Sequence, residues 1–369
     1  MRMKAAVLYE EHQPVVVEEV DLRGPEDGEV LIRIAASGVC HSDYHRVTGD
    51  IPNPLPAILG HEASGVVEDI GPGVTRVAKG DRVVLSWAPF CEECFYCKRN
   101  QPAQCVKFWE EGGKGTLFDG RIHLSKADQP IYHCCFISSF AEYCVVPETG
   151  CVVIPDAMPF DRASLLGCAV TTGVGAAINT AKVQPGSSIV VIGCGGVGLN
   201  VIQGAVLSGA ERIVAVDLEP AKFDLARRLG ATDTLDAREV DVVEAVLDLT
   251  DGLGADYGFE AIGLPETMEQ AWDVTRRRGT VVVVGVGAVG ARMRVPADKL
   301  AEKEKTLTGS YYGGSHPPTF VPWLISLYLD GKLKLDELMA RTYALDDTEK
   351  ALQDLKLDDA GRGVLLMDS

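Results

Sequence analysis

The chain has 369 residues, which is long for a single hydrophobic core and predicts two domains. Its hydrophobic content of 46% and charged content of 24% are typical of a water-soluble globular protein. The formal net charge of −18 argues against nucleic-acid binding, because a nucleic-acid surface needs clustered Lys and Arg to neutralise phosphates.

We expect neither a membrane span nor a secretion signal. No apolar run is long enough to cross a bilayer, and the first residues lack the apolar centre of a signal peptide. The cysteines are clustered as in metal sites and are not spread as an even disulfide framework, which is usual in a reducing compartment. We therefore expect a cytoplasmic protein.

Residues 1–170 predict a β-rich domain with many turns. Residues 29–39 (EVLIRIAASGV) and 63–74 (ASGVVEDIGPGV) combine β-branched residues with Gly and Pro. Gly80 and Asp81 form a turn signal directly before RVVL, which predicts a further strand.

Potential metal ligands lie in separate segments of the chain, the first of which follows a predicted strand. Cys40 and His45 lie in one segment, His61 lies in GHE (60–62), and Cys168 lies later in LLGCAVTTG. Two thiolates and an imidazole leave a fourth zinc position open, as a catalytic zinc requires. Isolated Cys and His residues are more often buried structural side chains, so spacing alone leaves both interpretations open.

A run of four cysteines lies between these segments. Its spacing is C-x2-C-x2-C-x7-C, and its members are Cys91, Cys94, Cys97 and Cys105. Thiolates this close in sequence can all reach one tetrahedral Zn²⁺ at about 2.3 Å each. Four thiolates leave no vacant position, so the run predicts a structural zinc lobe at about residues 88–108.

The central part of the chain changes to an α/β pattern. Residues 187–231 predict a strand, a glycine-rich turn, a helix, a strand and a helix, and residues 256–263 and 280–287 add two apolar strands. This alternation predicts a doubly wound parallel sheet. After Tyr311 we expect a helix in PTFVPWLISLYLDGKL and a short strand in RGVLLMD that returns to the first domain.

The glycine-rich turn GCGGVG (193–198) predicts a dinucleotide site. It follows an apolar strand and opens a helix, which is the context that the motif requires. Gly193 permits the tight turn, Gly195 lets a pyrophosphate approach the backbone, and Gly198 allows close helix–sheet packing. Asp217 ends the next strand and can bind a ribose diol, and no Arg follows it directly, so NAD is favoured over NADP.

The order of these motifs resembles the zinc-dependent alcohol dehydrogenases of the medium-chain dehydrogenase/reductase superfamily. The resemblance covers essentially the whole chain and rests on GHE, the four-cysteine run, Cys40, Cys168, GCGGVG with Asp217, and the terminal GRGVLLM (361–367). It implies an α/β architecture, in which a β-rich GroES-like catalytic domain (1–169 and 312–369) encloses an NAD-binding Rossmann domain (170–311). It also implies substrate binding between the domains and a homodimer or homotetramer.

The resemblance further implies roles for individual residues. The catalytic zinc ligands would be Cys40, His61 and Cys168, with Glu62 beside the metal and Asp43 orienting the histidine. The implied cofactor-binding residues are His41, Thr172, Gly193, Gly195, Gly196, Val197, Gly198, Asp217, Lys222, Val284, Val286 and Arg362. Because His41 stands where many relatives place an Arg against the pyrophosphate, we expect weaker cofactor binding and faster release.

The implied activity is reversible hydride transfer between a primary alcohol and NAD. Ser42 would accept the hydroxyl proton, and His45 would relay it to solvent, since free histidine titrates near pH 6.5. Trp87 matches a position in the pocket wall and would favour primary over secondary alcohols. Trp109, with Phe108 and Phe118, could line the entrance and suit an aromatic or long-chain substrate.

Two related activities remain open alternatives. A thiol-dependent formaldehyde dehydrogenase, acting on a glutathione or mycothiol adduct, is favoured by KGTLFDG (114–120), QPIYH (129–133) and AINTAKVQPGS (177–187). Against it, Trp109 replaces an Arg of the glutathione-dependent enzymes, His45 occupies a position that is usually not histidine there, and only Lys107 offers a nearby cation. The other alternative is a dehydrogenase that keeps NAD permanently bound.

A catalytically inactive zinc-bearing relative is disfavoured, because all three implied catalytic ligands are present. The remaining cysteines have no predicted function beyond packing, and they are Cys134, Cys135, Cys144, Cys151 and Cys194.

Overall fold

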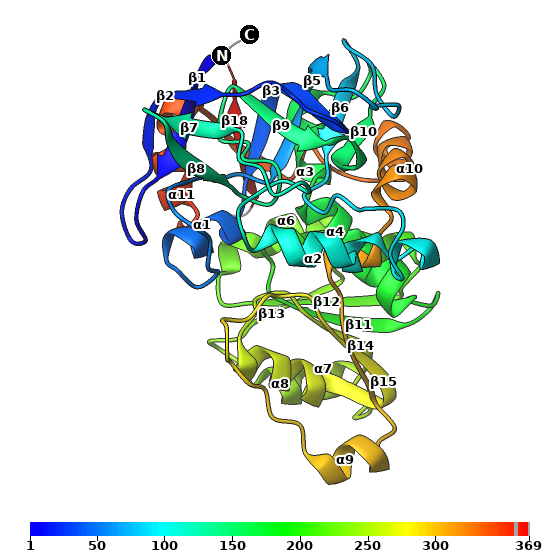
Figure 1. Cartoon of the computed structure of the whole chain (residues 1–369). Helices are drawn as coiled ribbons and strands as arrows, with labels where there is room; N and C mark the ends of the chain where they lie inside the picture. The colour runs from blue at the N-terminus through cyan, green and yellow to red at the C-terminus, as the bar shows by residue number, and fades with distance from the viewer. Residues whose placement is uncertain (358–360, 368–369) are drawn as a thin grey trace. The chain divides into compact units, whose positions relative to one another are not determined.

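The computed structural model describes residues 1–357 and 361–367 (Figure 1). By its internal contacts the chain divides into two compact units. The first unit comprises Met1–Cys168, His316–Leu357 and the terminal segment from Arg362, and the second comprises Ala169–Ser315. The sequence prediction placed the two boundaries at residues 169/170 and 311/312, and whether these units are functional domains stays a prediction.

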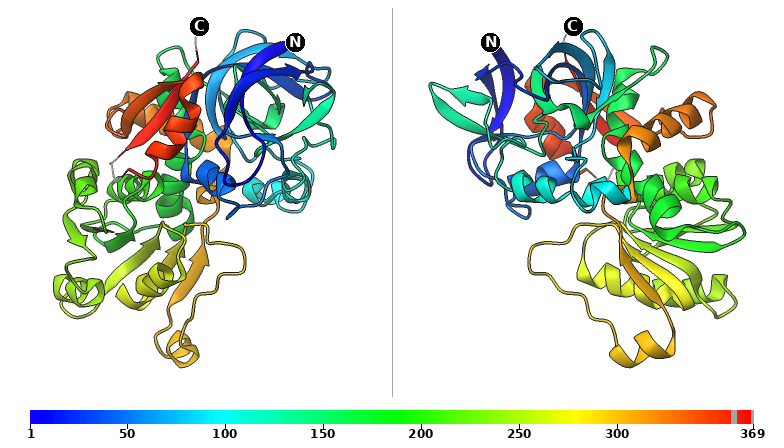
Figure 2. Two further views of the ribbon diagram at one scale, coloured as in Figure 1. Left: turned by 90° about the vertical axis from the view of Figure 1, so that its left-hand side faces the viewer. Right: turned by 45° about the vertical axis from the view of Figure 1, so that its right-hand side comes forward.

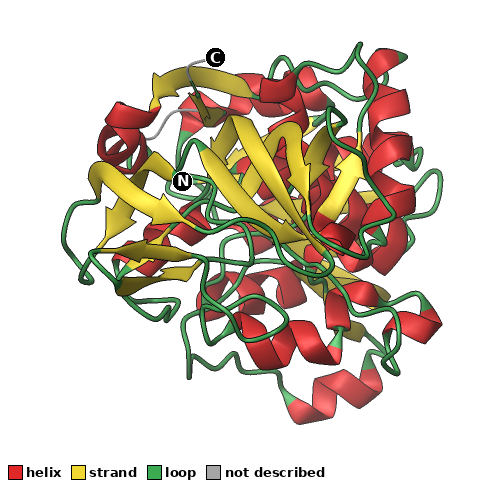
Figure 3. Ribbon diagram, turned by 45° about the horizontal axis from the view of Figure 1, so that its top comes forward, coloured by secondary structure: helices red, strands yellow, loops and turns green. Residues whose placement is uncertain are grey.

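The first unit is rich in strands. Figure 3 shows its strands in yellow and the long loops between them in green. Its strands are β1 (Arg2–Leu8), β2 (Val16–Leu22), β3 (Glu29–Val39), β4 (Ala57–Ile58), β5 (Glu62–Ile70), β6 (Arg82–Leu85), β7 (Leu124–Lys126), β8 (Gln129–His133), β9 (Tyr143–Pro147), β10 (Cys151–Val153), β17 (Met339–Ala344) and β18 (Arg362–Leu366). Its helices are α1 (His41–Val47), α2 (Val106–Gly112), α3 (Phe160–Leu166), α10 (Pro317–Leu329) and α11 (Thr348–Asp354).

These strands form a barrel and a sheet. The closed barrel has the order β1-β2-β7-β8-β4, and the sheet has the order β10-β6-β5-β3-β18-β17, with β9 added on β3. The terminal strand β18 runs antiparallel to β3, with Gly363 opposite Val39, and parallel to β17. The expected return of the chain end to the first unit is therefore confirmed.

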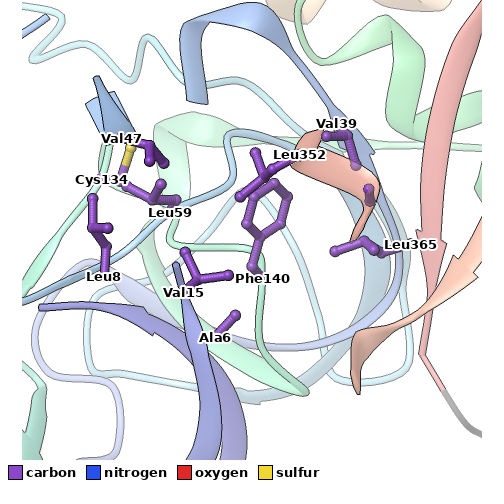
Figure 4. Close-up of a cluster of buried hydrophobic side chains, with 11 residues drawn as sticks. Ala6, Leu8, Val15, Val39, Val47, Leu59, Cys134, Phe140, Leu352 and Leu365 are labelled. Atoms are coloured by element: carbon purple, nitrogen blue, oxygen red, sulfur yellow. The ribbon is translucent and has the colours of Figure 1, made fainter. Parts of the chain in front are cut away.

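A buried apolar cluster joins early and late segments of the first unit (Figure 4). Phe140 lies at its centre in the view of Figure 4, near Leu352 of α11 and Val15. Val39 and Val47 bring the end of β3 and the end of α1 into the same core. Burial of these side chains fixes α1 and the end of β3, which flank Cys40 of the candidate site described below.

The second unit is an α/β layer structure. Its strands are β11 (Ser188–Ile192), β12 (Arg212–Asp217), β13 (Asp233–Asp236), β14 (Ala255–Glu260), β15 (Thr275–Val283) and β16 (Thr306–Gly309). Its helices are α4 (Ala169–Gly175), α5 (Gly196–Leu207), α6 (Phe223–Leu229), α7 (Val242–Leu249), α8 (Pro265–Val274) and α9 (Ala297–Glu302).

Its sheet has the order β13-β12-β11-β14-β15-β16, and every pairing between neighbours is parallel. Figure 1 shows α7 and α8 on one side of these strands, and Figure 2 shows the sheet from two further directions. The neighbouring strands β11 and β12 are largely apolar runs because both faces of a doubly wound sheet are covered. This order is that of a Rossmann fold, so the predicted fold class is confirmed.

Within the described residues, no single helix is both long and apolar enough to cross a membrane. One bent pair, α3 followed by the helical stretch Ala169–Ala181, reaches the necessary length and composition only when its two parts are taken together.

Candidate metal and cofactor sites

Four potential metal ligands meet in the interior of the first unit. The ligand atoms of Cys40, His61, Glu62 and Cys168 all lie within 4.8 Å of one another, and all four residues are buried. Cys40 lies between β3 and α1, His61 directly precedes β5, Glu62 begins β5, and Cys168 follows α3. Residues separated by more than 100 positions in the sequence are thus brought together by the pairing of β3 with β5 and by the packing of α3 on both strands.

Asp43 orients the histidine of this cluster. Its Oδ1 lies 2.9 Å from Nδ1 of His61, and the same oxygen accepts the backbone N–H of Gly60 at 3.1 Å. The other oxygen, Oδ2, accepts the backbone N–H of Cys40 at 3.2 Å. Because Nδ1 donates to a carboxylate, Nε2 of His61 is the nitrogen left for a metal.

Glu62 forms a buried ion pair with Arg362 from β18, with 2.5 Å between Oε1 and Nη2. Burial raises the pKa of Glu62 to about 7, although the guanidinium opposes this shift. The sequence prediction placed Arg362 near a pyrophosphate, whereas the structure places its side chain on Glu62 beside the ligand cluster. A phosphate contact by Arg362 stays a prediction.

The helix α1 carries the predicted proton-relay residues. Ser42 and His45 both lie on it, and the ring centroids of His41 and His45 are 6.4 Å apart. Nδ1 of His45 lies 3.2 Å from Oδ2 of Asp50, which also accepts the Thr48 hydroxyl at 2.6 Å. The imidazole of His45 is 35% exposed, so one nitrogen is engaged by a carboxylate while the side chain reaches solvent.

The four-cysteine run forms a second group of ligands. The Sγ atoms of Cys91, Cys94, Cys97 and Cys105 all lie within 4.8 Å of one another. The distances from Cys97 are 3.5 Å to Cys94 and 4.0 Å to Cys91. Desolvation raises the pKa of the Cys94 thiol, but backbone N–H groups of Cys97 and Val106 outweigh it and lower the value to about 6.

Both donor sets fit zinc. Four thiols whose sulfur atoms are close enough to bind one ion, supported by backbone N–H donors, are the ligands of a closed structural site. Two thiols and an oriented imidazole, with a carboxylate nearby, are the ligands of an open site. Among the described residues these are the two groups of three or more His, Cys, Asp or Glu side chains with suitable spacing.

The glycine-rich turn of the second unit is shaped for a phosphate. Gly193 has a φ of +99°, and a Cβ added to it would lie 2.6 Å from the side chain of Ile262. A Cβ added to Gly195 would meet nothing within 4 Å, so the space over this residue is open. Gly196, Val197 and Gly198 begin α5 directly after it, and the N-terminus of this helix favours an anion.

Asp217 is held at the end of β12. Its Oδ2 accepts the backbone N–H of Cys194 at 2.7 Å, and its Oδ1 accepts the N–H of Glu219 and the ammonium of Lys222, both at 3.0 Å. The carboxylate is only 9% exposed, and these three hydrogen bonds hold it in position. Such a carboxylate favours a free ribose diol over a 2′-phosphate.

Three further predicted cofactor residues also lie in the second unit. Thr172 lies on α4, and its buried Oγ1 has no hydrogen-bond partner in the described part of the chain. A buried hydroxyl without a partner is expected where a bound ligand supplies the hydrogen bond. Val284 is buried and Val286 is exposed, and both follow β15.

Comparisons with known proteins agree with this geometry. Residues 26–156 match the model for "Alcohol dehydrogenase GroES-like domain", and residues 196–328 match "Zinc-binding dehydrogenase". An S-(hydroxymethyl)glutathione dehydrogenase from Paracoccus denitrificans is 38% identical over 375 residues, covering 99% of this chain and 100% of that protein. The chain belongs to the zinc-dependent alcohol dehydrogenases of the medium-chain superfamily.

Two further proteins are similar to this chain over nearly their full length. An alcohol dehydrogenase class-3 from Zea mays is 38% identical over 369 residues, covering 99% of this chain and 96% of that protein. Among solved structures, a benzyl alcohol dehydrogenase from Acinetobacter calcoaceticus has a TM-score of 0.95 and 34% identity, with 100% of both chains covered. The zinc-dependent alcohol dehydrogenases use zinc and NAD, as the resemblance predicted.

The two predicted pocket tryptophans have different surroundings. Trp87 is buried, and its ring lies 5.9 Å from the ring of Phe108. Trp109 packs edge-on against the same Phe108 at 5.5 Å but is 51% exposed. The ring centroid of Phe118 lies 5.1 Å from that of Phe136, and the ammonium of Lys107 lies 5.2 Å from the centroid of the Phe118 ring.

Some residues near the site were not found from the sequence. Asp50 and Thr48, which engage His45, carry no motif that marks them, and an Asp five residues after a His is unremarkable in a loop. Arg46 and Cys135 also went unassigned, although Nη2 of Arg46 lies 3.1 Å from the Cys135 sulfur. No spacing rule signals this contact, because it joins α1 to a turn almost 90 residues later.

Proposed function

We propose that this chain catalyses NAD-dependent oxidation of a primary hydroxyl group to an aldehyde. The observation that carries the proposal is the buried cluster of Cys40, His61 and Cys168, in which Asp43 fixes the histidine. In this assignment residues 1–169 and 312–369 form the catalytic domain, and residues 170–311 form the NAD-binding domain. The four-cysteine lobe would then have a structural role.

Zinc, when bound by Cys40, His61 and Cys168, would supply a Lewis acid that makes a substrate hydroxyl easier to deprotonate. The chain itself would hold and move the proton. Ser42 would accept it from the substrate, and His45 would pass it to solvent through the nitrogen that Asp50 does not engage. The second unit would hold the hydride acceptor, with phosphates over Gly195 and a ribose on Asp217.

The first substrate candidate is the hydroxymethyl adduct of a thiol. The curated relatives include S-(hydroxymethyl)glutathione dehydrogenases from two bacteria at 38% identity over at least 95% of this chain, and these names favour the thiol-dependent alternative over a simple alcohol. Lys107 offers a cation near Phe118 for the acidic groups of such an adduct. Trp109 remains a departure from the glutathione-dependent pattern.

An aromatic primary alcohol is the second candidate. It is supported by the benzyl alcohol dehydrogenase, which matches over the full length of both chains. The aromatic group formed by Trp87, Phe108 and Trp109 offers the surface that a benzylic ring would contact.

A substrate panel decides between these candidates. NADH formation is measured with formaldehyde alone, with formaldehyde plus glutathione or mycothiol, and with benzyl alcohol. Activity that needs a thiol supports the first candidate, and thiol-independent oxidation of benzyl alcohol supports the second. No NAD-dependent activity with any of them, in protein that holds two zinc ions per chain, would contradict the proposed reaction.

We also expect the protein to be a homodimer or homotetramer. Light scattering coupled to size-exclusion chromatography tests this expectation directly.

A further inference from the structure

Two adjacent cysteines, Cys134 and Cys135, form a tight turn directly after β8. The backbone N–H groups of Ile137 and Ser138 both donate to the carbonyl oxygen of Cys134, at 3.0 and 3.1 Å. Cys135 has a φ of +51°, in the left-handed region that residues other than glycine seldom adopt. The turn thus fixes the two neighbouring side chains in very different surroundings.

Cys134 is completely buried. Its sulfur lies in the apolar core of the first unit, where Figure 4 shows it beside Val47 and Leu59. Cys135 is partly exposed, and its sulfur accepts a hydrogen bond from Nη2 of Arg46 at 3.1 Å. One thiol of the pair is therefore shielded, and the other lies against a cation within reach of small solutes.

The electrostatic surroundings separate the two thiols further. The Cys134 thiol donates to Cys135, and this hydrogen bond, together with the Arg46 guanidinium, lowers the pKa of Cys135 against the opposing desolvation. The same hydrogen bond, together with the burial of Cys134 itself, raises the pKa of the Cys134 thiol. A thiolate at Cys135 beside a protonated Cys134 is the arrangement of an attacking and a resolving cysteine.

We propose that Cys134 and Cys135 form an oxidant-responsive thiol pair, in which Cys135 reacts with hydrogen peroxide and Cys134 resolves the product. In the first step the Cys135 sulfur attacks one peroxide oxygen, so an S–O bond forms, the O–O bond breaks and hydroxide leaves. In the second step the Cys134 sulfur attacks the sulfenic acid, so an S–S bond forms, the S–O bond breaks and water leaves with the thiol proton. The thiol pair loses two electrons, and the peroxide gains them.

Oxidation of this pair acts on the helix that carries the relay residues. The guanidinium of Arg46 binds Cys135 through Nη2 and the carbonyl oxygen of Ser42 through Nη1, at 2.8 Å. Oxidation of Cys135 removes the anionic partner of Arg46, and Cys134 packs against Val47 at the end of the same helix. The zinc ligands are not part of the reaction, so the proposal does not depend on which substrate the enzyme uses.

The test exposes zinc-loaded protein to hydrogen peroxide near neutral pH and maps the cysteines by mass spectrometry. Cleavage after Glu142 separates Cys134 and Cys135 from Cys144 and Cys151. We expect the first peptide to lose two thiol hydrogens, reversibly with dithiothreitol, at least about tenfold faster than Cys144 is modified, because burial raises the pKa of the Cys144 thiol. Oxidation confined to the four lobe cysteines, or equal rates at Cys135 and Cys144, would overturn the proposal.

Three variants assign the roles. Cys134→Ser should stop at a sulfenic acid on Cys135, which dimedone traps, and Cys135→Ser should leave this segment unoxidised. Arg46→Gln should slow the oxidation of Cys135 by roughly threefold or more, because it removes the stabilising cation. Oxidation of Cys134 in the Cys135→Ser protein at the wild-type rate would reverse the assignment and contradict the proposal.

Turnover of the same samples tests the link to α1. We expect peroxide to lower turnover of the wild-type protein, dithiothreitol to restore it, and Cys135→Ser to resist the change. Unchanged turnover of fully oxidised protein would show that the pair does not act on the helix.

Discussion

The carboxylate of Asp43 lies 2.9 Å from Nδ1 of His61, and both side chains are almost completely excluded from water. Asp43 also accepts the backbone N–H groups of Cys40 and Gly60, so one carboxylate fixes two candidate ligands at once. A single side chain thus holds the Cys40 backbone and the His61 imidazole in place for metal binding.

We expect Asp43→Asn to weaken zinc binding at the Cys40–His61–Cys168 cluster by about 10–100-fold, because the amide cannot hold the imidazole as firmly as a carboxylate. Competition with a chromophoric chelator measures this affinity. Asp50→Asn is the matched control, since it removes a carboxylate that contacts His45 and not the ligand cluster. Equal zinc affinities in the two variants would contradict the orienting role of Asp43.

The four-cysteine lobe should stabilise the fold and take no part in the reaction. Cys97→Ser is expected to lose one of two zinc ions and to lower the free energy of unfolding by roughly 3 kcal/mol or more. Metal analysis and thermal unfolding measure both effects, with Cys151→Ser as a buried cysteine outside the lobe. A Cys97→Ser protein that kept its stability and both zinc ions but lost turnover would show that the two sites had been assigned the wrong way round.

The relay predicts a defect that depends on pH. His45→Gln should slow turnover increasingly as pH falls below about 8, because hydroxide becomes too scarce to replace the imidazole as proton acceptor. Imidazole buffers should restore part of the rate. Asp50→Asn should give a smaller defect of the same shape, since Asp50 positions the ring and does not receive the proton. A uniform loss at every pH in both variants points to a structural role instead.

Asp217 should determine the choice of cofactor. Asp217→Asn removes the charge that would repel a 2′-phosphate and frees Lys222 from its ion pair. We expect the ratio of kcat/KM for NAD to that for NADP to fall by about 10–100-fold, which corresponds to the loss of hydrogen bonds to a charged group. Asp224→Asn is the control, because it makes the same charge change at a residue whose side chain is 91% exposed. Wild-type protein that used NADP as well as NAD would refute the argument at once.

Lys305 gives the second unit a stability that depends on pH. Burial lowers the pKa of this ammonium to about 8, while its Nζ donates to the carbonyl oxygen of Trp272 at 2.5 Å. The folded state therefore releases its proton earlier than the unfolded state, whose lysine titrates near 10.4. Between these values the unfolded state holds more protons, so stability from this group rises with pH across that window.

Lys305→Met should remove this rise and should stabilise the protein near pH 7, where the wild type buries a charge. Chemical denaturation at a series of pH values measures the difference between the two proteins. Lys332→Met, which removes an exposed ammonium paired with Asp330, should leave the pH dependence unchanged. Parallel curves for Lys305→Met and the wild type would contradict the assignment.

The sequence predicted those parts of the fold that depend on local pattern. The apolar strand before GCGGVG, the turn itself and the helix after it are all specified within a few residues, and β11, Gly193 and α5 appear where expected. The four cysteines of the lobe lie within one short segment, so their spacing alone predicted their meeting.

The Cys40–His61–Cys168 cluster needed more than local pattern. Its ligands come together through the pairing of β3 with β5 and the packing of α3, which spacing does not reveal. Resemblance to a family supplied what spacing could not. Contacts outside the family pattern, such as those of Arg46 with Cys135 and of Asp50 with His45, could not be predicted, because each depends on the exact placement of one side chain.

The position of β18 sets the order in which this protein can be completed during synthesis. The ribosome delivers β3 and β5 before the second unit, but β18, the strand that lies between β3 and β17, emerges only after it. The second unit is continuous from Ala169 to Ser315, so it can fold while the first still lacks a strand and the Arg362 partner of Glu62. A nascent chain would therefore carry a folded second unit and an incomplete first unit until β18 has been synthesised.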